Sequence, residues 1–214
     1  MRPKLVIFDC DGVIVDSEKV TNAVMRDNLA GYGLTLSITQ IMDLFVGGTM
    51  QGVMELARDM GAKLPETWLD EIYGEMFAAL SRDVELVAGV DTVLDRLDAA
   101  GIPYAIGSNG PHAKMDITLT KTAIKARFEG RIYSREDVAA PKPAPDVYLK
   151  AAQDAGVAPT DCVVVEDSAS GARAAVAAKM RCFGFHADTP RKKLTPHCDA
   201  LFARMSDLPD LLGV

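Results

Sequence analysis

Two carboxylates near the start of the chain stand close enough in sequence to act together. The apolar run Leu5–Phe8 leads directly into Asp9, and Asp11 follows one residue later, before Gly12. Two like charges at the end of a buried strand repel each other, and each is costly to remove from water. A glycine after the second acid permits the sharp turn that brings both carboxyl groups to one point. The pair therefore predicts a site that also contains positive charge.

Polar side chains also follow later apolar runs. Ser108 and Asn109 come after a run in the middle of the chain, and Glu166 and Asp167 come directly after residues 162–165. In an open parallel sheet, ligands bind beyond the carboxyl ends of the strands. We therefore expect these four residues to lie at the same end of the sheet as the first two acids.

One cation, Lys142, stands in the segment APKPAP between Pro141 and Pro143. Proline fixes its own φ and restricts the residue before it to extended geometry. A lysine held in this way has a restricted backbone, which suits a charge that must be aimed at a ligand.

Together these side chains form an oxygen-rich set with one ammonium group. Asp and Glu side chains provide the hard oxygen ligands that Mg²⁺ prefers. Lys142 adds a positive charge and Ser108 a hydrogen-bond donor, which suits the equatorial oxygens of a phosphoryl group during in-line transfer. A carboxylate can attack phosphorus to give an aspartyl-phosphate. A second carboxyl two residues away can protonate the leaving oxygen and then deprotonate the attacking water.

Other metal- and phosphate-binding patterns do not fit the chain. An EF-hand loop requires an acid or amide at its fifth position and glycine at its sixth, where this sequence has Val13 and Ile14. The sequence contains neither G-x-x-x-x-G-K-[ST] nor G-x-G-x-x-G, and its three histidines are not spaced as zinc ligands.

Short apolar runs separated by helical patterns indicate the elements that position these residues. The runs lack the alternation of a half-exposed strand, so we predict strands buried on both faces. Helices are indicated over 90–101 and over the alanine-rich segment 168–180, for which Asp167 is a candidate N-cap. Such alternation predicts an α/β fold with a doubly wound, Rossmann-like parallel sheet. The predicted strands are 5–8, 103–107, 131–133, 162–165 and 182–185.

Residues 17–84 interrupt this alternation, because they contain helical stripes and no convincing strand. The stripes lie within 20–25, 53–60 and 69–80. We therefore predict two domains: an α/β core made of residues 1–16 and 85–214, and an all-α helical domain made of residues 17–84.

Composition narrows the class of protein. The chain has 214 residues, 49% of them hydrophobic, and a formal charge of −7, which weighs against binding a polyanion such as DNA. No apolar run approaches the length of a membrane span, and the four apolar residues before Asp9 are too few for a signal peptide. The four cysteines show no C-x-x-C spacing and indicate reduced thiols. We expect a cytoplasmic monomer without nucleic-acid or membrane partners, whose partner is a small phosphorylated metabolite.

The ordered set of motifs resembles the haloacid dehalogenase superfamily over nearly the whole chain. The helical insert resembles the α-helical cap of the branch that contains sugar-phosphate phosphatases and β-phosphoglucomutase. The segments that carry the resemblance are DCDGVIVDS at residues 9–17, SNG at 108–110, KP at 142–143 and EDS at 166–168.

This resemblance implies a role for each residue of the motifs. Asp9 would be the nucleophile and Asp11 the general acid and base, while Ser108 and Lys142 would bind the phosphoryl oxygens. Mg²⁺ would be held by the Asp9 carboxylate, the backbone carbonyl of Asp11 and Asp167, with Glu166 close by, directly or through water. For contacts with phosphate or substrate we also expect Asn109, Gly48 and Thr49.

The departures from the family pattern bear on the reaction. Dehalogenases lack the second acid of the first motif, so Asp11 favours phosphoryl transfer. The mutase has a histidine at the position of Thr21 and an arginine at or near the position of Met50. Because both residues are neutral here, a phosphatase is favoured over a mutase. The stretches SNGPHAKM and CFGFHADTP resemble phosphatases that act on 6-phosphogluconate and related sugar phosphates. A mutase and a non-enzymatic sensor of phosphorylated metabolites remain the alternatives.

Overall fold

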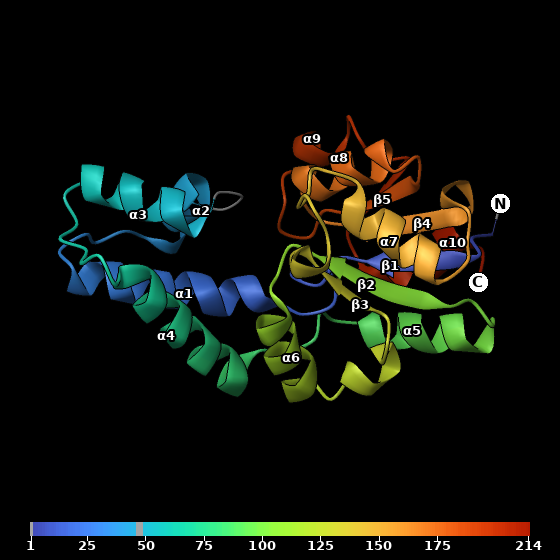
Figure 1. The fold of residues 1–214 in the computed structure, drawn as a ribbon, viewed down its shortest axis with the longest axis horizontal. Coiled ribbons are helices and arrows are strands. Elements are labelled where there is room, and N and C mark those ends of the chain that lie inside the picture. Colours follow the sequence, from blue (N-terminus) through green and yellow to red (C-terminus); the bar gives the residue numbers. More distant parts are fainter. Residues whose placement is uncertain (1, 46–48) are drawn as a thin grey trace. The chain divides into compact units, whose positions relative to one another are not determined.

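The computed structural model describes residues 2–45 and 49–214. The chain forms two compact units (Figure 1). One unit combines the residues up to Asp16 with Glu85–Val214, and the other is Ser17–Val84. Each unit is described by itself below.

The first unit is built on a parallel sheet. Within its described residues the sheet has six strands in the order β3-β2-β1-β4-β5-β6, and every neighbouring pair is parallel. This confirms the predicted doubly wound α/β class. Five strands lie within one residue of the predicted ones, whereas the last strand, only three residues long, was not predicted. The strands are β1 (Leu5–Phe8), β2 (Tyr104–Ser108), β3 (Ile132–Ser134), β4 (Cys162–Glu166), β5 (Arg181–Phe185) and β6 (Ala200–Phe202).

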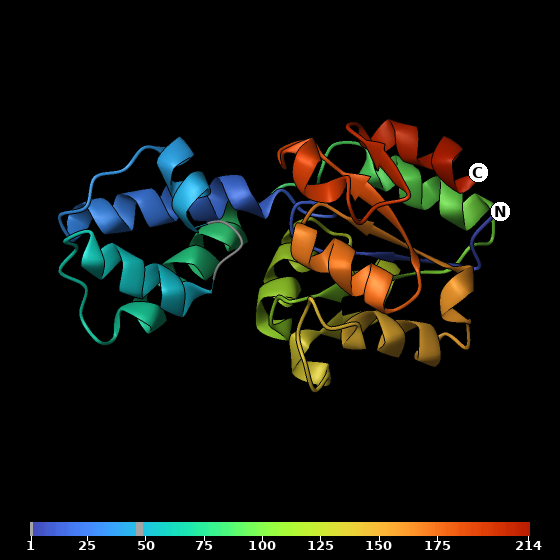
Figure 2. The ribbon, with the colours of Figure 1, turned by 90° about the horizontal axis from the view of Figure 1, so that it is seen from above.

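Helices cover both faces of the sheet, which explains why the strands carry no alternation of apolar and polar residues. Figure 2 shows α5 and α10 on one face and α7 and α8 on the other. All four residues of β1 are buried, and Leu5 and Ile7 pack with α7 and α8 in one apolar cluster. The helices of this unit are α5 (Val90–Ala99), α6 (His112–Lys121), α7 (Asp146–Asp154), α8 (Ala169–Ala177), α9 (Arg191–Leu194) and α10 (Leu208–Leu212), with 3₁₀ turns at Lys125–Phe128, Arg135–Asp137, Pro159–Asp161 and Met205–Asp207.

The N-cap of α8 differs from the expected one. The Ser168 side chain, and not that of Asp167, accepts a hydrogen bond from the backbone N–H of Gly171 at 3.0 Å. A serine hydroxyl satisfies one of the donors that the first turn of a helix leaves without a partner. Asp167 is therefore not needed as the helix cap.

The order of the strands reverses at β1, and this reversal fixes where a ligand can bind. The chain proceeds from β1 to β2 and β3 on one side, and then returns to β4, β5 and β6 on the other. Phe8 pairs with Val165, and the backbone N–H of Asp9 donates to the Val165 carbonyl at 2.9 Å. The carboxyl ends of β1 and β4 thus form the topological switch point, where ligands bind in open α/β sheets.

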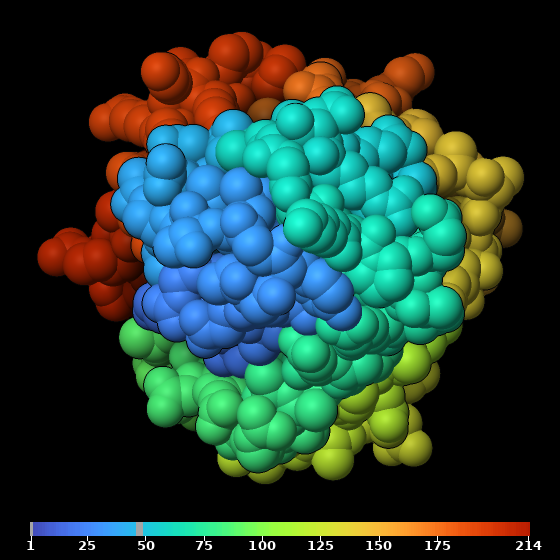
Figure 3. Space-filling view, turned by 90° about the vertical axis from the view of Figure 1, so that its left-hand side faces the viewer, coloured from blue at the N-terminus to red at the C-terminus, as the bar shows by residue number. Residues whose placement is uncertain are grey.

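The second unit consists of helices in the part of it that is described, residues 17–45 and 49–84. Helix α2 is the one that the apolar stripes did not predict. Figure 3 shows the blue to teal residues of this unit packed against one another. Trp68 is fully buried among them, and its indole N–H donates to Asn28 Oδ1 at 2.7 Å. The helices are α1 (Ser17–Gly31), α2 (Ile38–Phe45), α3 (Met50–Asp59) and α4 (Trp68–Asp83).

The chain leaves the first unit and returns to it at neighbouring points. Val15 and Leu86 form an antiparallel bridge. The Asp16 N–H donates to the Glu85 carbonyl at 2.9 Å, and the Val87 N–H donates to the Ile14 carbonyl at 3.0 Å. This pairing explains how a long insert leaves the sheet intact, because the two ends of the insert are held together.

Candidate active site

A buried ammonium group lies between two carboxylates at the switch point of the sheet. Lys142 Nζ donates to Asp9 Oδ1 at 2.6 Å and to Glu166 Oε1 at 2.7 Å. Asp9 follows β1, and Glu166 is the last residue of β4. All three residues are buried, so these charge-assisted hydrogen bonds form in a low-dielectric environment.

Glu166 is fully buried, and hydrogen bonds to both of its oxygens compensate its charge. Oε1 also accepts from the hydroxyl of Tyr148 at 2.7 Å, and Oε2 accepts from the backbone N–H and the hydroxyl of Ser168, each at 2.9 Å. Burial alone would raise the pKa of Glu166, but the charge of Lys142 and these hydrogen bonds outweigh it, and the pKa lies below its usual range. Glu166 is therefore a fixed negative charge that holds Lys142.

Asp9 has the opposite balance. Burial raises the pKa of its carboxyl to about 7, the charges of Glu166 and Asp11 add to this, and the charge of Lys142 opposes it. The acids outnumber the cations around Asp9, so a further positive charge would favour its ionised form. This electrostatic imbalance is the structural counterpart of the repulsion predicted from the sequence.

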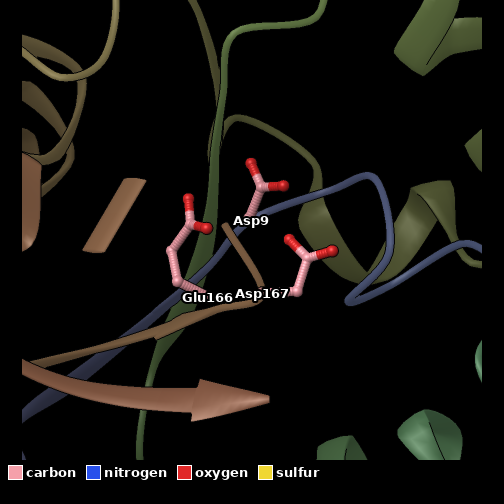
Figure 4. Close-up of side chains that lie close together, drawn as sticks. All are labelled: Asp9, Glu166 and Asp167. Carbon is pink, nitrogen blue, oxygen red and sulfur yellow. The ribbon is translucent and has the colours of Figure 1, made fainter. Parts of the chain in front are cut away.

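A set of three carboxylates meets the requirements of a divalent cation. One oxygen each from Asp9, Glu166 and Asp167 lies within 4.8 Å of the others. Figure 4 shows the three side chains next to one another, where the ends of β1 and β4 meet. Oxygen ligands in this number fit Mg²⁺. Because each Glu166 oxygen already accepts two hydrogen bonds, Asp9 and Asp167 are the better direct ligands in this set.

Gly12 allows the turn after Asp11 to approach the acidic cluster. Its φ is +76°, and a Cβ atom placed there would overlap the carboxylate of Asp167. A side chain at this position would therefore be strained and would also displace a candidate metal ligand. The close approach is compatible with the Asp11 carbonyl serving as a ligand, which remains a prediction.

Asn109 and Ser108 lie where β2 ends, but the structure gives them different surroundings. The Asn109 side chain accepts from the Lys142 backbone N–H at 2.8 Å and donates to the Lys142 carbonyl at 3.2 Å. Ser108 is buried, and its Oγ accepts from the Gly110 N–H at 3.0 Å. Asn109 thus positions the Lys142 backbone, and its expected contact with phosphate stays a prediction.

Lys114 is the residue that sequence reasoning did not assign. Its Nζ pairs with Asp11 Oδ1 at 2.7 Å, and both side chains are largely buried. Burial alone would lower the pKa of Lys114, but the charge of Asp11, its hydrogen bond and the neighbouring charges together outweigh burial and raise this pKa. The available signal was the stretch SNGPHAKM, in which Lys114 falls in the first turn of the helix that follows Ser108.

The predicted site residues of the helical unit are described only in part. Thr49 is the N-cap of α3, and its Oγ1 accepts from the Gly52 N–H at 3.1 Å. Gly48 lies outside the described residues. The hydroxyl of Thr21 donates to the Ser17 carbonyl at 3.1 Å, within α1. A contact of Gly48 or Thr49 with substrate remains a prediction.

The doubly wound parallel sheet, with a cluster of acids and a lysine at its switch point, defines an enzyme with a Rossmann-like fold and a carboxylate-rich site, and the comparison with known families agrees. The family model described as haloacid dehalogenase-like hydrolase matches residues 3–179. The chain therefore belongs to the haloacid dehalogenase-like hydrolases, which confirms the resemblance inferred from the motifs.

Individual relatives share the whole length of the chain. The 6-phosphogluconate phosphatase of Escherichia coli is 28% identical over 212 residues, which cover 98% of this chain and 95% of that protein. The crystal structure of a haloacid dehalogenase-like protein of unknown function from Agrobacterium tumefaciens is 35% identical, with a TM-score of 0.89 and coverage of 98% and 97%. A haloacid dehalogenase family hydrolase from Deinococcus radiodurans, crystallised with phosphate and sodium, is 31% identical, with a TM-score of 0.87 and coverage of 99% and 96%.

Family membership and relatives named as phosphatases confirm the expectation that the chain is an enzyme of the phosphatase class. The non-enzymatic sensor is thereby set aside. Among the residues that the structure describes, no helix is long and apolar enough to cross a membrane.

Proposed function

We propose that this protein is a Mg²⁺-dependent phosphatase that hydrolyses a small phosphorylated sugar or sugar acid through an aspartyl-phosphate at Asp9. The observation that carries the proposal is the Lys142 ammonium between Asp9 and Glu166, beside the carboxylate of Asp167. A nucleophile, a cation and a hard-oxygen ligand set occupy one point, which phosphoryl transfer requires.

Binding of the phosphoryl group is assigned to Lys142 and Ser108. Lys142 has three N–H donors, of which the bonds to Asp9 and Glu166 use two, so the third is available for a phosphoryl oxygen. Ser108 contributes its hydroxyl from the end of β2. A Mg²⁺ ion held by the carboxylates of Asp9 and Asp167 and the carbonyl of Asp11, with Glu166 next to it, would neutralise charge on Asp9 and on the phosphoryl oxygens.

The reaction then proceeds in two displacements. A carboxylate oxygen of Asp9 attacks phosphorus while Asp11 donates a proton to the leaving alcohol oxygen, which gives the aspartyl-phosphate and the free alcohol. Asp11, now a carboxylate, takes a proton from a water molecule that attacks the same phosphorus. Asp9 is released with inorganic phosphate as the second product.

The substrate class is supported by what the relatives are and by what this chain lacks. A full-length relative is named 6-phosphogluconate phosphatase. The neutral residues Thr21 and Met50 stand where the mutase has cationic or ionisable side chains, so a second phosphate has no charge partner at these positions. A substrate with a single phosphate is therefore favoured over the bisphosphate of a mutase.

A panel of phosphorylated metabolites tests the proposal. With Mg²⁺ present we expect release of inorganic phosphate from sugar or sugar-acid monophosphates, and loss of turnover after chelation, restored by Mg²⁺. Ca²⁺ should inhibit, because its higher coordination number can engage both oxygens of Asp9. Full turnover after exhaustive chelation would remove the metal from the mechanism.

A second assay separates hydrolysis from the mutase reaction. β-Glucose 1-phosphate is supplied with a trace of the 1,6-bisphosphate, and glucose 6-phosphate is followed against free phosphate. We expect no measurable interconversion. Steady formation of glucose 6-phosphate faster than free phosphate would favour the mutase.

The cytoplasmic location, the monomeric state and the absence of nucleic-acid or membrane partners remain predictions from the sequence.

A further inference from the structure

Two cysteines outside the active site lie in contact. Cys182 is in β5 and is fully buried, whereas Cys198 precedes β6 and is partly exposed. Their Sγ atoms are 3.6 Å apart. The other two cysteines, Cys10 and Cys162, are buried.

The surrounding residues hold Cys198 against Cys182. The next residue, Asp199, accepts from the Cys182 backbone N–H through Oδ2 and donates its own N–H to the Cys182 carbonyl, both at 2.8 Å. Gly184 lies two residues further along β5, and a Cβ atom there would be only 2.8 Å from Cys198 Sγ. The missing side chain of Gly184 therefore provides the space in which the Cys198 sulfur lies.

The geometry points to a modification site: we propose that Cys182 and Cys198 form a reversible intramolecular disulfide when the protein meets a peroxide. A sulfur–sulfur bond of about 2.05 Å requires the two atoms to approach by roughly 1.5 Å from their present contact. Such a shift is available because β6 lies at the end of the sheet, beside β5, in the described strand order. The segment before β6 can move toward β5 without opening the central strands.

The reaction balances with a peroxide as oxidant. The Cys198 thiolate attacks one peroxide oxygen and breaks the O–O bond, which gives a sulfenic acid and, after protonation, water. The Cys182 sulfur then attacks the Cys198 sulfur and displaces the sulfenic hydroxyl, which leaves as the second water. Overall the two thiols lose two protons and two electrons, and hydrogen peroxide takes up both and is reduced to two waters.

The two sulfurs are suited to different steps. Cys198 is accessible, and the hydrogen bond from the Cys182 thiol lowers its pKa, although burial and the charges of Glu166 and Asp199 oppose this. The same hydrogen bond, together with burial, raises the pKa of Cys182. Cys198 is thus the sulfur that meets the oxidant, and Cys182 is the sulfur that resolves the sulfenic acid.

Peptide mapping of the full-length protein tests the proposal. Cleavage after arginine and lysine separates the two cysteines into peptides 182–191 and 194–204. After treatment with hydrogen peroxide we expect two of the four thiols to be lost, with these two peptides joined and two hydrogens lighter than their sum. Dithiothreitol should restore both peptides and all four thiols.

Matched variants separate the pair from a single reactive cysteine. In Cys182→Ala, Cys198 has no resolving partner, so it should gain oxygen and reach the sulfinic acid, which dithiothreitol does not reverse. In Cys198→Ser, the buried Cys182 should keep its thiol under the same treatment, and Cys162→Ala should behave as the native protein does. Overturning results are sulfinic Cys198 in the native protein without the joined peptides, or a disulfide that involves Cys10 or Cys162.

Discussion

The side-chain amide of Asn109 holds the main chain of Lys142 at both of its polar groups. It accepts from the Lys142 N–H at 2.8 Å and donates to the Lys142 carbonyl at 3.2 Å. The backbone of Lys142 is therefore fixed to the end of β2, while its ammonium reaches the ends of β1 and β4. Asn109 therefore positions Lys142, the residue that is proposed to bind the phosphoryl group.

Loss of this amide should weaken catalysis without removing any proposed catalytic group. We expect Asn109→Ala to lower kcat/KM for a phosphate ester by about 10- to 100-fold, a range typical of residues that orient catalytic ligands. Asn109→Asp keeps the hydrogen-bond acceptor but loses the donor, so its kcat/KM should lie between that of the native enzyme and that of Asn109→Ala. Gln153→Ala, at an exposed amide in α7, is the control. Native kcat/KM in Asn109→Ala would show that Lys142 needs no such support.

The two acids of the first motif should separate in kinetics. Asp9→Asn removes the proposed nucleophile, so turnover should be lost while substrate still binds. Asp11→Asn keeps the backbone carbonyl but loses proton transfer, which typically contributes about 10²–10⁴-fold. Rapid-quench assays with a substrate labelled in its phosphoryl group check this. The label should become bound to the protein in the native enzyme and not in Asp9→Asn. Near-native turnover of Asp9→Asn would exclude covalent catalysis at that residue.

Lys114 should act through Asp11, with which it pairs at 2.7 Å. We expect Lys114→Gln to lower kcat about tenfold, because the proposed acid and base loses the group that orients it. Lys114→Arg should recover most of the loss. Lys121→Gln, at an exposed position of the same helix, should leave kcat unchanged. An effect on KM alone in Lys114→Gln would instead assign Lys114 to substrate binding.

Gly171 should be intolerant of the change that usually stabilises a helix. A Cβ atom at this position of α8 would overlap the Glu166 carboxylate, so Gly171→Ala should displace Glu166 and lower the free energy of unfolding by several kcal/mol. At Gly74 in α4 no atom of the described residues, apart from the adjacent residues and the nearby backbone of the helix itself, lies within 4 Å of the added Cβ, so Gly74→Ala should stabilise the protein by about 1 kcal/mol. Urea unfolding measures both. Equal effects of the two substitutions would show that the contact with Glu166 relaxes without cost.

Asp137 should make the free energy of unfolding depend on pH in the acidic range. Its carboxylate accepts from the Ser134 N–H at 2.8 Å and lies 2.8 Å from the His112 ring nitrogen. Burial alone would raise the pKa of Asp137, but these hydrogen bonds together outweigh it and hold the pKa below its usual range. A carboxyl whose pKa is depressed in the folded state stabilises the fold at pH values above its unfolded-state pKa. This stabilisation is lost as the pH falls through the folded-state pKa.

The comparison with Asp137→Asn measures this contribution. At pH 7 we expect the native protein to be more stable by about 1 kcal/mol, because the asparagine oxygen still accepts from the Ser134 N–H but lacks the charge that strengthens the hydrogen bond. The difference in free energy of unfolding should shrink as the pH falls below about 4, the usual pKa of an aspartate in an unfolded chain. Urea titrations over this range check the trend, and a difference that does not change with pH would assign the effect to packing.

The sequence by itself determined the class of the fold and the order of its motifs. Strands buried on both faces are read from apolar runs, and the parallel sheet places Asp9 and Glu166 at the same end of their strands. Strand β6 and helix α2 escaped prediction because each is short and buries few side chains: only Phe202 is buried in β6, and only Ile41 and Phe45 are buried in α2. For the other strands and helices the local pattern of apolar residues was sufficient, since that pattern depends only on residues close together in the sequence.

Only the tertiary structure decided which side chains meet. Lys142 is 133 residues from Asp9, and Lys114 is 103 residues from Asp11. Their contacts depend on strand register, on where each helix begins and on the direction of each side chain, none of which is encoded by spacing within a motif. For the same reason the hydrogen bonds between the Asn109 amide and the Lys142 backbone were not predicted from the sequence. A polar side chain at a strand end has several partners within reach, and only the packing of the other strands and loops selects among them.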